Sequence, residues 1–146
     1  MDASPSVADA IADLLRALGA RAAGLWWVDG GCLAQAAFVA CAEMPADVAR
    51  EFAAATLSVP LTERSLGIVA AGTMGATVVS RVVELEAASG SGRWLRAFGA
   101  ERSVAVPLVG ENGCVVGVLS VALPASPESD ETVAGRLCEA GRSLRP

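Results

Sequence analysis

The chain has no histidine, no lysine and no tyrosine among its 146 residues. Histidine is the side chain that most often transfers protons near neutral pH, so its absence excludes Ser-His and Cys-His catalytic arrangements. Glu84 and Glu86 are close in sequence, but they lie in a polar segment and are better explained as solvated charges than as an acid–base pair. The sequence therefore predicts a domain without catalytic residues.

Cysteine is also scarce, and the cysteines are far apart: Cys32, Cys41, Cys114 and Cys138. No two of them are within four residues of each other, so the Cys-x-x-Cys spacing of redox and metal sites is missing. We interpret all of them as small buried hydrophobic side chains in a reducing compartment. A thiol sensor or a set of iron–sulfur ligands is the alternative interpretation. We expect no metal and no cofactor.

Long apolar segments and positive charge are missing as well. No run of about 18 apolar residues is unbroken, and the N-terminus has no basic flank of a signal peptide. We therefore expect a cytoplasmic chain without a membrane partner. The 11 arginines face 16 acidic residues, for a net charge of −5, which argues against a nucleic-acid partner. With 53% hydrophobic residues, residues 1–146 are expected to form a single domain with its own core.

The most informative segment is an apolar hairpin in the second half of the chain. Two apolar runs, Ser103–Leu108 and Cys114–Leu123, lie on either side of the pair Asn112-Gly113. Both residues of that pair tolerate a positive φ, which makes it the strongest short-range signal of a tight hairpin turn. Gly117 lies inside the second run, where a glycine indicates a bulge or the close approach of another backbone or a ligand.

The spacing of apolar residues and the capping residues indicate the other elements. Helices are expected at Ser6–Leu18, Pro45–Leu57, Ser65–Ala71, Gly92–Phe98 and from Ser126–Glu131 to about Leu144, and further strands at Ala22–Val28, Cys32–Ala42 and Ala76–Val82. Glu84–Gly92 is polar and rich in glycine and serine, so we expect a loop there. This order of elements predicts an α+β fold on an antiparallel sheet.

The hairpin, with Arg102-Ser103 at its start and Val106-Pro107-Leu108 before its turn, resembles the signature hairpin of the GAF domain family. Three further segments resemble the family in the same order: Val59–Leu61 with Ser65–Gly72, Ala76–Val79, and Leu123–Glu128. The resemblance covers about residues 6–144. It implies a GAF-like, profilin-related α+β fold with a central antiparallel sheet of five to six strands. The first and last helices would cover one face, and short helices would roof a ligand pocket on the other.

The resemblance also implies a function. Such domains act in bacterial regulatory proteins as signalling modules that sense a small organic ligand. We expect a homodimer built by the first and last helices, with an effector protein supplied in trans. The residues expected to line the pocket are Trp94 and Phe98 on the roof helix, Thr73 and Met74 on the preceding turn, Arg102 and Ser103 on the signature strand, and Trp27. Plain core packing is the competing interpretation of Trp94 and Phe98.

Two other classes of function stay open. The chain is also compatible with a scaffold that binds no ligand, either a degenerate GAF domain or a dimer of the roadblock type. A cysteine-based redox sensor that uses Cys32, Cys41 or Cys114 is the third hypothesis. Family members that reduce free methionine sulfoxide carry clustered cysteines in the loop that corresponds to Leu85–Phe98, and this chain has none there.

Overall fold

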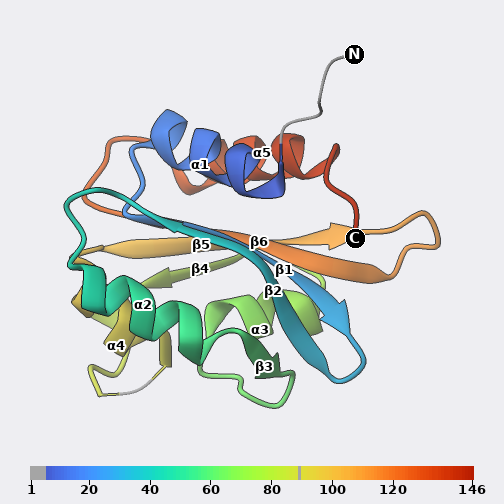
Figure 1. Cartoon of the computed structure of the whole chain (residues 1–146), viewed down its shortest axis with the longest axis horizontal. Coiled ribbons are helices and arrows are strands. Elements are labelled where there is room, and N and C mark those ends of the chain that lie inside the picture. The colour runs from blue at the N-terminus through green and yellow to red at the C-terminus, as the bar shows by residue number, and fades with distance from the viewer. Residues whose placement is uncertain (1–5, 89) are drawn as a thin grey trace.

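The computed structural model describes residues 6–88 and 90–146 (Figure 1). The helices are α1 (Val7–Leu18), α2 (Ala46–Ala55), α3 (Gly67–Met74), α4 (Gly90–Phe98) and α5 (Asp130–Gly141), with a 3₁₀ helix η1 (Val82–Glu84). The strands are β1 (Ala22–Asp29), β2 (Cys32–Ala40), β3 (Ser58–Pro60), β4 (Val78–Arg81), β5 (Arg102–Val109) and β6 (Val115–Leu123).

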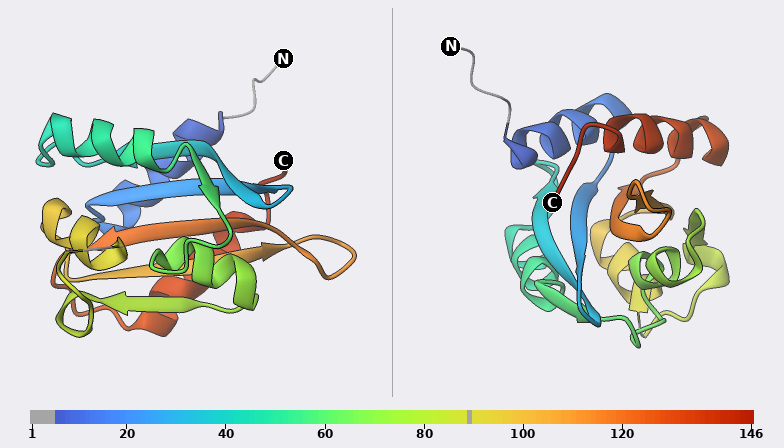
Figure 2. Two further views of the ribbon diagram at one scale, coloured as in Figure 1. Left: turned by 90° about the horizontal axis from the view of Figure 1, so that it is seen from below. Right: turned by 90° about the vertical axis from the view of Figure 1, so that its right-hand side faces the viewer.

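The strands form one antiparallel sheet in the order β3-β2-β1-β6-β5-β4. Helices α1 and α5 lie side by side over one face, and α2, α3 and α4 lie on the other side (Figures 1 and 2). This arrangement confirms the expected α+β fold and its two helical layers. No helix in the described part of the chain is long and apolar enough to cross a membrane.

Helix α1 shows how local sequence sets an element. The Ser6 side chain accepts a hydrogen bond from the Asp9 amide at 3.1 Å, and Gly19 ends the helix with a φ of +61°. Both residue types are common at helix ends. Serine satisfies a free N–H of the first turn, and glycine adopts the left-handed conformation after the last turn without a steric penalty. The apolar stripe of Ile11, Leu14 and Leu15 is buried against the sheet.

The β5–β6 hairpin forms where the sequence predicts it. Gly113 in its turn has a φ of +81°, whereas Asn112 does not have a positive φ, so only the glycine of the pair uses the left-handed conformation. The close approach predicted at Gly117 is confirmed, because a Cβ there would lie 2.6 Å from the ring of Trp27 and 2.8 Å from the Trp26 carbonyl oxygen. The missing side chain lets the Trp27 ring of the neighbouring strand lie flat on β6.

Some element boundaries differ from the expectation. Helix α3 continues past Gly72 to Met74, because Gly72 packs closely over the sheet, with a would-be Cβ 3.3 Å from Val118. Helix α5 begins after Ser129, whose hydroxyl accepts from the Thr132 amide, so the earlier Ser126 is not its N-cap. Tertiary contacts decide such ends more strongly than local propensity.

The interpretation of every cysteine as a buried hydrophobic side chain is wrong for two of them. Cys32 and Cys41 are half-buried, but Cys114 and Cys138 are exposed. Cys114 lies at the hairpin turn, and Cys138 follows the buried Leu137 on α5, so it points away from the sheet. All four thiols are free.

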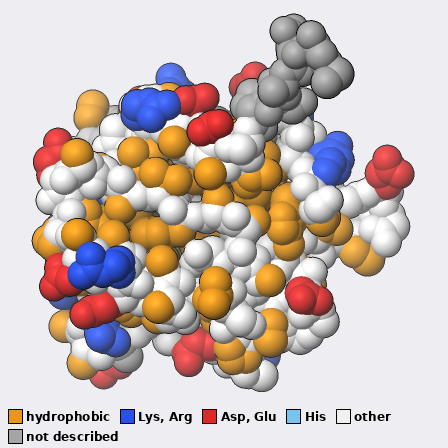
Figure 3. All heavy atoms as spheres, viewed as in Figure 1, with side chains coloured by type: hydrophobic (Ala, Val, Ile, Leu, Met, Phe, Trp, Pro, Cys, Tyr) orange, Lys and Arg blue, Asp and Glu red, His pale blue; other side chains and the backbone are white. Residues whose placement is uncertain are grey.

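The β2 edge of the sheet carries an apolar surface. Strand β3 pairs with β2 only over Cys32–Ala34, so the later part of β2, which pairs with β1 on one side, has no described strand on its outer side. In the view of Figure 3, hydrophobic side chains gather between α1 and α2, where β2 faces the reader in Figure 1. Phe38, Val39 and Ala40 of this segment are half-buried.

Candidate functional site

The two faces of the central strands differ in side-chain size. The face toward α1 and α5 carries large buried residues such as Leu25, Val104 and Leu119. The face toward α3 and α4 carries small ones on two neighbouring rungs of β1, β6 and β5: Ala22, Ala122 and Ser103, then Gly24, Ser120 and Ala105. Small side chains on adjacent rungs leave space above the sheet, because a strand cannot move closer to fill it.

A cavity of about 50 Å³ lies in this space, between the sheet and helices α3 and α4. It is lined by the small residues of the sheet, by aromatic rings and by the start of α3: Ala22, Ala23, Gly24, Trp26, Phe38, Phe52, Leu66, Gly67, Ile68, Ser91, Trp94, Leu95, Phe98, Ser103, Ser120 and Ala122. A water molecule needs roughly 10–15 Å³ of such volume, so the cavity accepts a group of only a few heavy atoms.

Aromatic rings form one wall of the cavity and are held in fixed positions. The Phe52 ring packs edge-on against Phe98 and Trp94, with centroid distances of 5.0 and 5.1 Å. Trp26 lies across Gly24, and its Nε1 donates a hydrogen bond of 2.8 Å to the Thr56 carbonyl. Edge-to-face contacts add to the stability of such a cluster, so this wall is built before any ligand arrives.

The opposite end of the cavity is polar. Gly67 begins α3, and its amide donates a hydrogen bond of 2.8 Å to Ser91 Oγ. The hydroxyls of Ser80 and Ser103, an opposed pair on β4 and β5, lie close to the same point. The site therefore joins an apolar wall to a small group of hydroxyls at a helix N-terminus, the usual composition of a small-molecule pocket.

Three of the seven residues expected to line a pocket do line this cavity: Trp94, Phe98 and Ser103. Thr73 and Met74 do not, because α3 continues through them and turns them outward. Met74 is 69% exposed, and the Thr73 hydroxyl donates to the Val69 carbonyl of its own helix.

Trp27 also lies outside the cavity, because its ring belongs to the core beneath α1 and α5. Its neighbour Trp26 lines the cavity and is only 2% exposed. Successive residues of a strand point to opposite faces, and the sequence does not say which face receives the short helices. The choice between the two tryptophans therefore depended on the tertiary fold.

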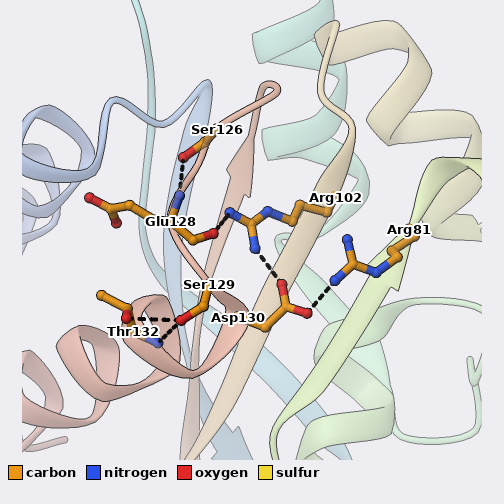
Figure 4. A network of polar contacts seen from close by, with 7 residues as sticks. All are labelled: Arg81, Arg102, Ser126, Glu128, Ser129, Asp130 and Thr132. Carbon is orange, nitrogen blue, oxygen red and sulfur yellow. Dashed lines mark hydrogen bonds and ion pairs between the residues drawn. The ribbon is translucent and has the colours of Figure 1, made fainter.

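Arg102 lies on the far side of the sheet from the cavity. Its guanidinium forms an ion pair with Asp130 and donates a hydrogen bond of 2.6 Å to the Glu128 carbonyl. Arg81 of β4 pairs with the other oxygen of the same carboxylate (Figure 4). The strand alternation that brings Ser103 to the cavity sends Arg102 to the start of α5.

Sequence reasoning missed several lining residues, among them Trp26, Phe38, Phe52 and Ser91. One pattern in the sequence could have predicted where the cavity lies, although it does not identify these side chains. The strands β1, β5 and β6 each contain small residues two positions apart, as in Ser103-Val104-Ala105 and Ser120-Val121-Ala122. The alternation of small and large residues on β5 and β6, beside the small Ala22-Ala23-Gly24 of β1, predicts a hollow on one face of a sheet.

The described residues contain no group of three or more cysteine or acidic side chains placed to hold a metal ion. Among the described residues that line the cavity, none is a cysteine. The chemistry available inside it is therefore that of aromatic contacts, serine hydroxyls and backbone amides.

The model of the GAF domain family matches residues 5–139. No curated protein matches the chain. The free methionine-R-sulfoxide reductase of Neisseria meningitidis, solved with its substrate, has a similar structure with a TM-score of 0.64 and 24% sequence identity. The similarity covers 93% of this chain and 71% of the reductase.

Two similar structures are GAF domains of signalling proteins. One belongs to a phosphoenolpyruvate-protein phosphotransferase of Coxiella burnetii, at a TM-score of 0.65 and 15% identity, over 96% of this chain and 83% of that one. The other belongs to a two-component sensor histidine kinase of Bacillus halodurans, at 0.64 and 13%, over 93% and 90%. At these identities the likeness shows the shared fold.

Proposed function

Because the chain belongs to the GAF domain family, whose members are typical of signalling and sensory proteins, we propose that it senses a small organic molecule. The ligand occupies the cavity under α3 and α4, with its apolar part against Phe98 and Trp94. The observation that supports this proposal is the cavity itself, with small residues below it and a fixed aromatic wall beside it.

We further propose that two copies of the chain form a homodimer through α1 and α5, and that this dimer transmits the ligand-bound state. The two helices lie side by side on the face away from the cavity (Figure 1). Their outward positions include small exposed residues, among them Ala17 and Cys138, which let another helix approach closely. A separate effector protein then binds the dimer and responds to its state.

A direct route connects the cavity to these helices. Ser103 lines the cavity, and the adjacent Arg102 holds Asp130, the first residue of α5. A ligand that shifts β5 by a small amount therefore acts on α5 through an ion pair as well as through packing. This route supports transmission of the bound state to the dimer surface.

Native mass spectrometry of the purified chain tests the proposal, because it reports the oligomeric state and any retained molecule together. We expect a dimer that carries a reproducible added mass. Replacement of Ser120 by valine, which adds bulk inside the cavity, should remove that mass. The same replacement at the exposed Ser58 of β3 should leave it.

Two other functions make different predictions for the same experiment. A scaffold without ligand gives a dimer of bare mass, and no small molecule raises its melting temperature, although any tight ligand must stabilise the folded state. The likeness to a reductase keeps an enzymatic role open, and the expectation of a non-catalytic domain stays a prediction. Serine replacements of Cys32, Cys41 and Cys114 test a thiol function, which requires that at least one of them abolishes activity.

A further inference from the structure

Two serine hydroxyls make no hydrogen bond to any described residue: that of Ser103, which lines the cavity, and that of Ser80, its partner on β4, which lies beside the lining residues. Ser80 and Ser103 are only 8% and 9% exposed, and they face each other across β4 and β5. No fully enclosed side-chain oxygen in the described part of the chain lacks a partner, so both Oγ atoms border space that a small group can reach. A hydroxyl that borders such space can donate a hydrogen bond to a polar ligand group placed there.

A third hydroxyl and the first turn of α3 converge on the same point. A Cβ built on Gly67 would lie 3.0 Å from Ser80 Oγ, 3.7 Å from Ser91 Oγ and 3.8 Å from Ser103 Oγ. Ser91 Oγ accepts from the Gly67 amide, and its own proton is therefore available for donation into the cavity. The absent side chain of Gly67 lets three hydroxyls lie close to the first turn of α3.

The donors at this end select a ligand that accepts hydrogen bonds. Among the described residues that line the cavity, none carries a charge, so a charged ligand of either sign has no counter-ion there and depends on hydrogen bonds and the helix dipole. The N-terminus of α3, an eight-residue helix, carries a partial positive charge that favours anions. Hydrogen bonds from N–H and O–H groups to an anionic oxygen are about twice as strong as neutral ones.

We propose that the ligand is a short-chain monocarboxylate. Its carboxylate lies between Ser80, Ser91 and Ser103 at the start of α3, and its short apolar tail contacts Phe98 and Trp94. The cavity of about 50 Å³ accepts roughly three to five water-sized groups, which matches a carboxyl group with a tail of one or two carbons. This inference rests on the proposed function, since it assigns a ligand class to the same cavity.

Binding of propionate tests the inference against molecules of similar size. Calorimetry and thermal unfolding are measured with propionate, with the uncharged propionamide, and with nitrate, an oxyanion that has no tail. We expect propionate to bind at least about tenfold more tightly than propionamide, the loss that one charge-assisted hydrogen bond accounts for. It should also bind more tightly than nitrate, because nitrate makes no use of the aromatic wall.

Two variants test whether the carboxylate binds at the serine hydroxyls. Replacement of Ser103 by alanine should raise the Kd of propionate roughly tenfold or more, and Ser58→Ala on β3 should leave it within about twofold. Gly67→Ala, whose added methyl would crowd the Ser80 hydroxyl and displace the neighbouring hydroxyls, should also weaken propionate binding. Circular dichroism confirms that each variant is folded before binding is compared.

The outcomes separate this inference from the proposed function. Equal or tighter binding of propionamide overturns the carboxylate assignment but leaves a ligand-binding cavity. Equal binding of nitrate overturns the role of the tail. Propionate that binds Ser103→Ala as well as the parent overturns the placement at the hydroxyls. If none of the three molecules binds, the inference is wrong, and the retained mass in native mass spectrometry decides the proposed function separately.

Discussion

Arg102 of β5 and Asp130 of α5 form an ion pair in which the arginine side chain is only 7% exposed. The pair connects the strand that lines the cavity with the first residue of the last helix. Arg81 contributes a second cation to the same carboxylate, so a single acidic residue joins β4, β5 and α5 (Figure 4).

Replacement of Asp130 by alanine should therefore destabilise the fold. The change leaves the Arg102 guanidinium buried with only the Glu128 carbonyl as a partner. We expect the free energy of unfolding to fall by about 2 kcal/mol, since hydrogen bonds to charged groups contribute about 1.5–3 kcal/mol. Urea unfolding measures the loss. The neighbouring Glu131→Ala, at an exposed position, should cost less than about 1 kcal/mol. Equal effects of the two changes would contradict a structural role for the ion pair.

Two glycine-to-alanine changes should have opposite effects on stability. At Gly117 a Cβ would lie 2.6 Å from Trp27, so Gly117→Ala should destabilise the protein by roughly 1–3 kcal/mol through overpacking. At Gly135 of α5 nothing lies within 4 Å of such a Cβ, and Gly135→Ala should stabilise by about 0.5–1 kcal/mol through helix propensity. Thermal unfolding of both variants decides this, and a stable Gly117→Ala protein would show that the Trp27 ring moves aside easily.

The aromatic wall should matter for both stability and ligand size. Phe98 is 4% exposed, and Phe98→Ala should lower the free energy of unfolding by about 3–5 kcal/mol. The enlarged cavity should then accept longer ligands than the parent does, which calorimetry with acids of increasing chain length would measure. Met74→Ala, at a position that is 69% exposed, should change stability by no more than about 0.5 kcal/mol and leave binding unchanged. An effect of Met74→Ala on affinity would restore it as a site residue.

A charge on the α1–α5 surface should dissociate the proposed homodimer. Ala17 is an exposed residue of α1, and Ala17→Glu places two like charges near each other across a symmetric interface. Light scattering should report a monomer for this variant and a dimer for Ala97→Glu, a matched change on the exposed side of α4. A dimer that persists in Ala17→Glu would reject this interface, and the apolar β2 edge would then be the surface to test.

Much of the fold is readable because local chemistry dictates it. The Ser6 cap, the Gly19 terminator and the Asn112-Gly113 turn each satisfy a requirement of the backbone within a few residues. The spacing of apolar residues then separates helices from strands. Most helices and strands were therefore predicted correctly. The period of apolar residues missed β3 and η1, where three residues are too few to show one, and β3 was indicated only by the family resemblance. Helix α4 begins at Gly90, inside the segment expected as a loop.

The candidate site was predictable only in part. Trp94, Phe98 and Ser103 were found because their helix and strand were placed correctly. Thr73 and Met74 were expected on a turn, but Gly72 packs against Val118 and the helix continues through them.

The sequence by itself determined most of the elements, their order and the alternation of small and large residues on β5 and β6. Only the tertiary structure decided which side of the sheet the short helices cover, and with it the choice of Trp26 over Trp27 and of Ser103 over Arg102 as cavity residues. The physical reason is that alternation along a strand defines two faces without naming them. Which face of the sheet borders the cavity is decided when helices from distant parts of the chain pack on it.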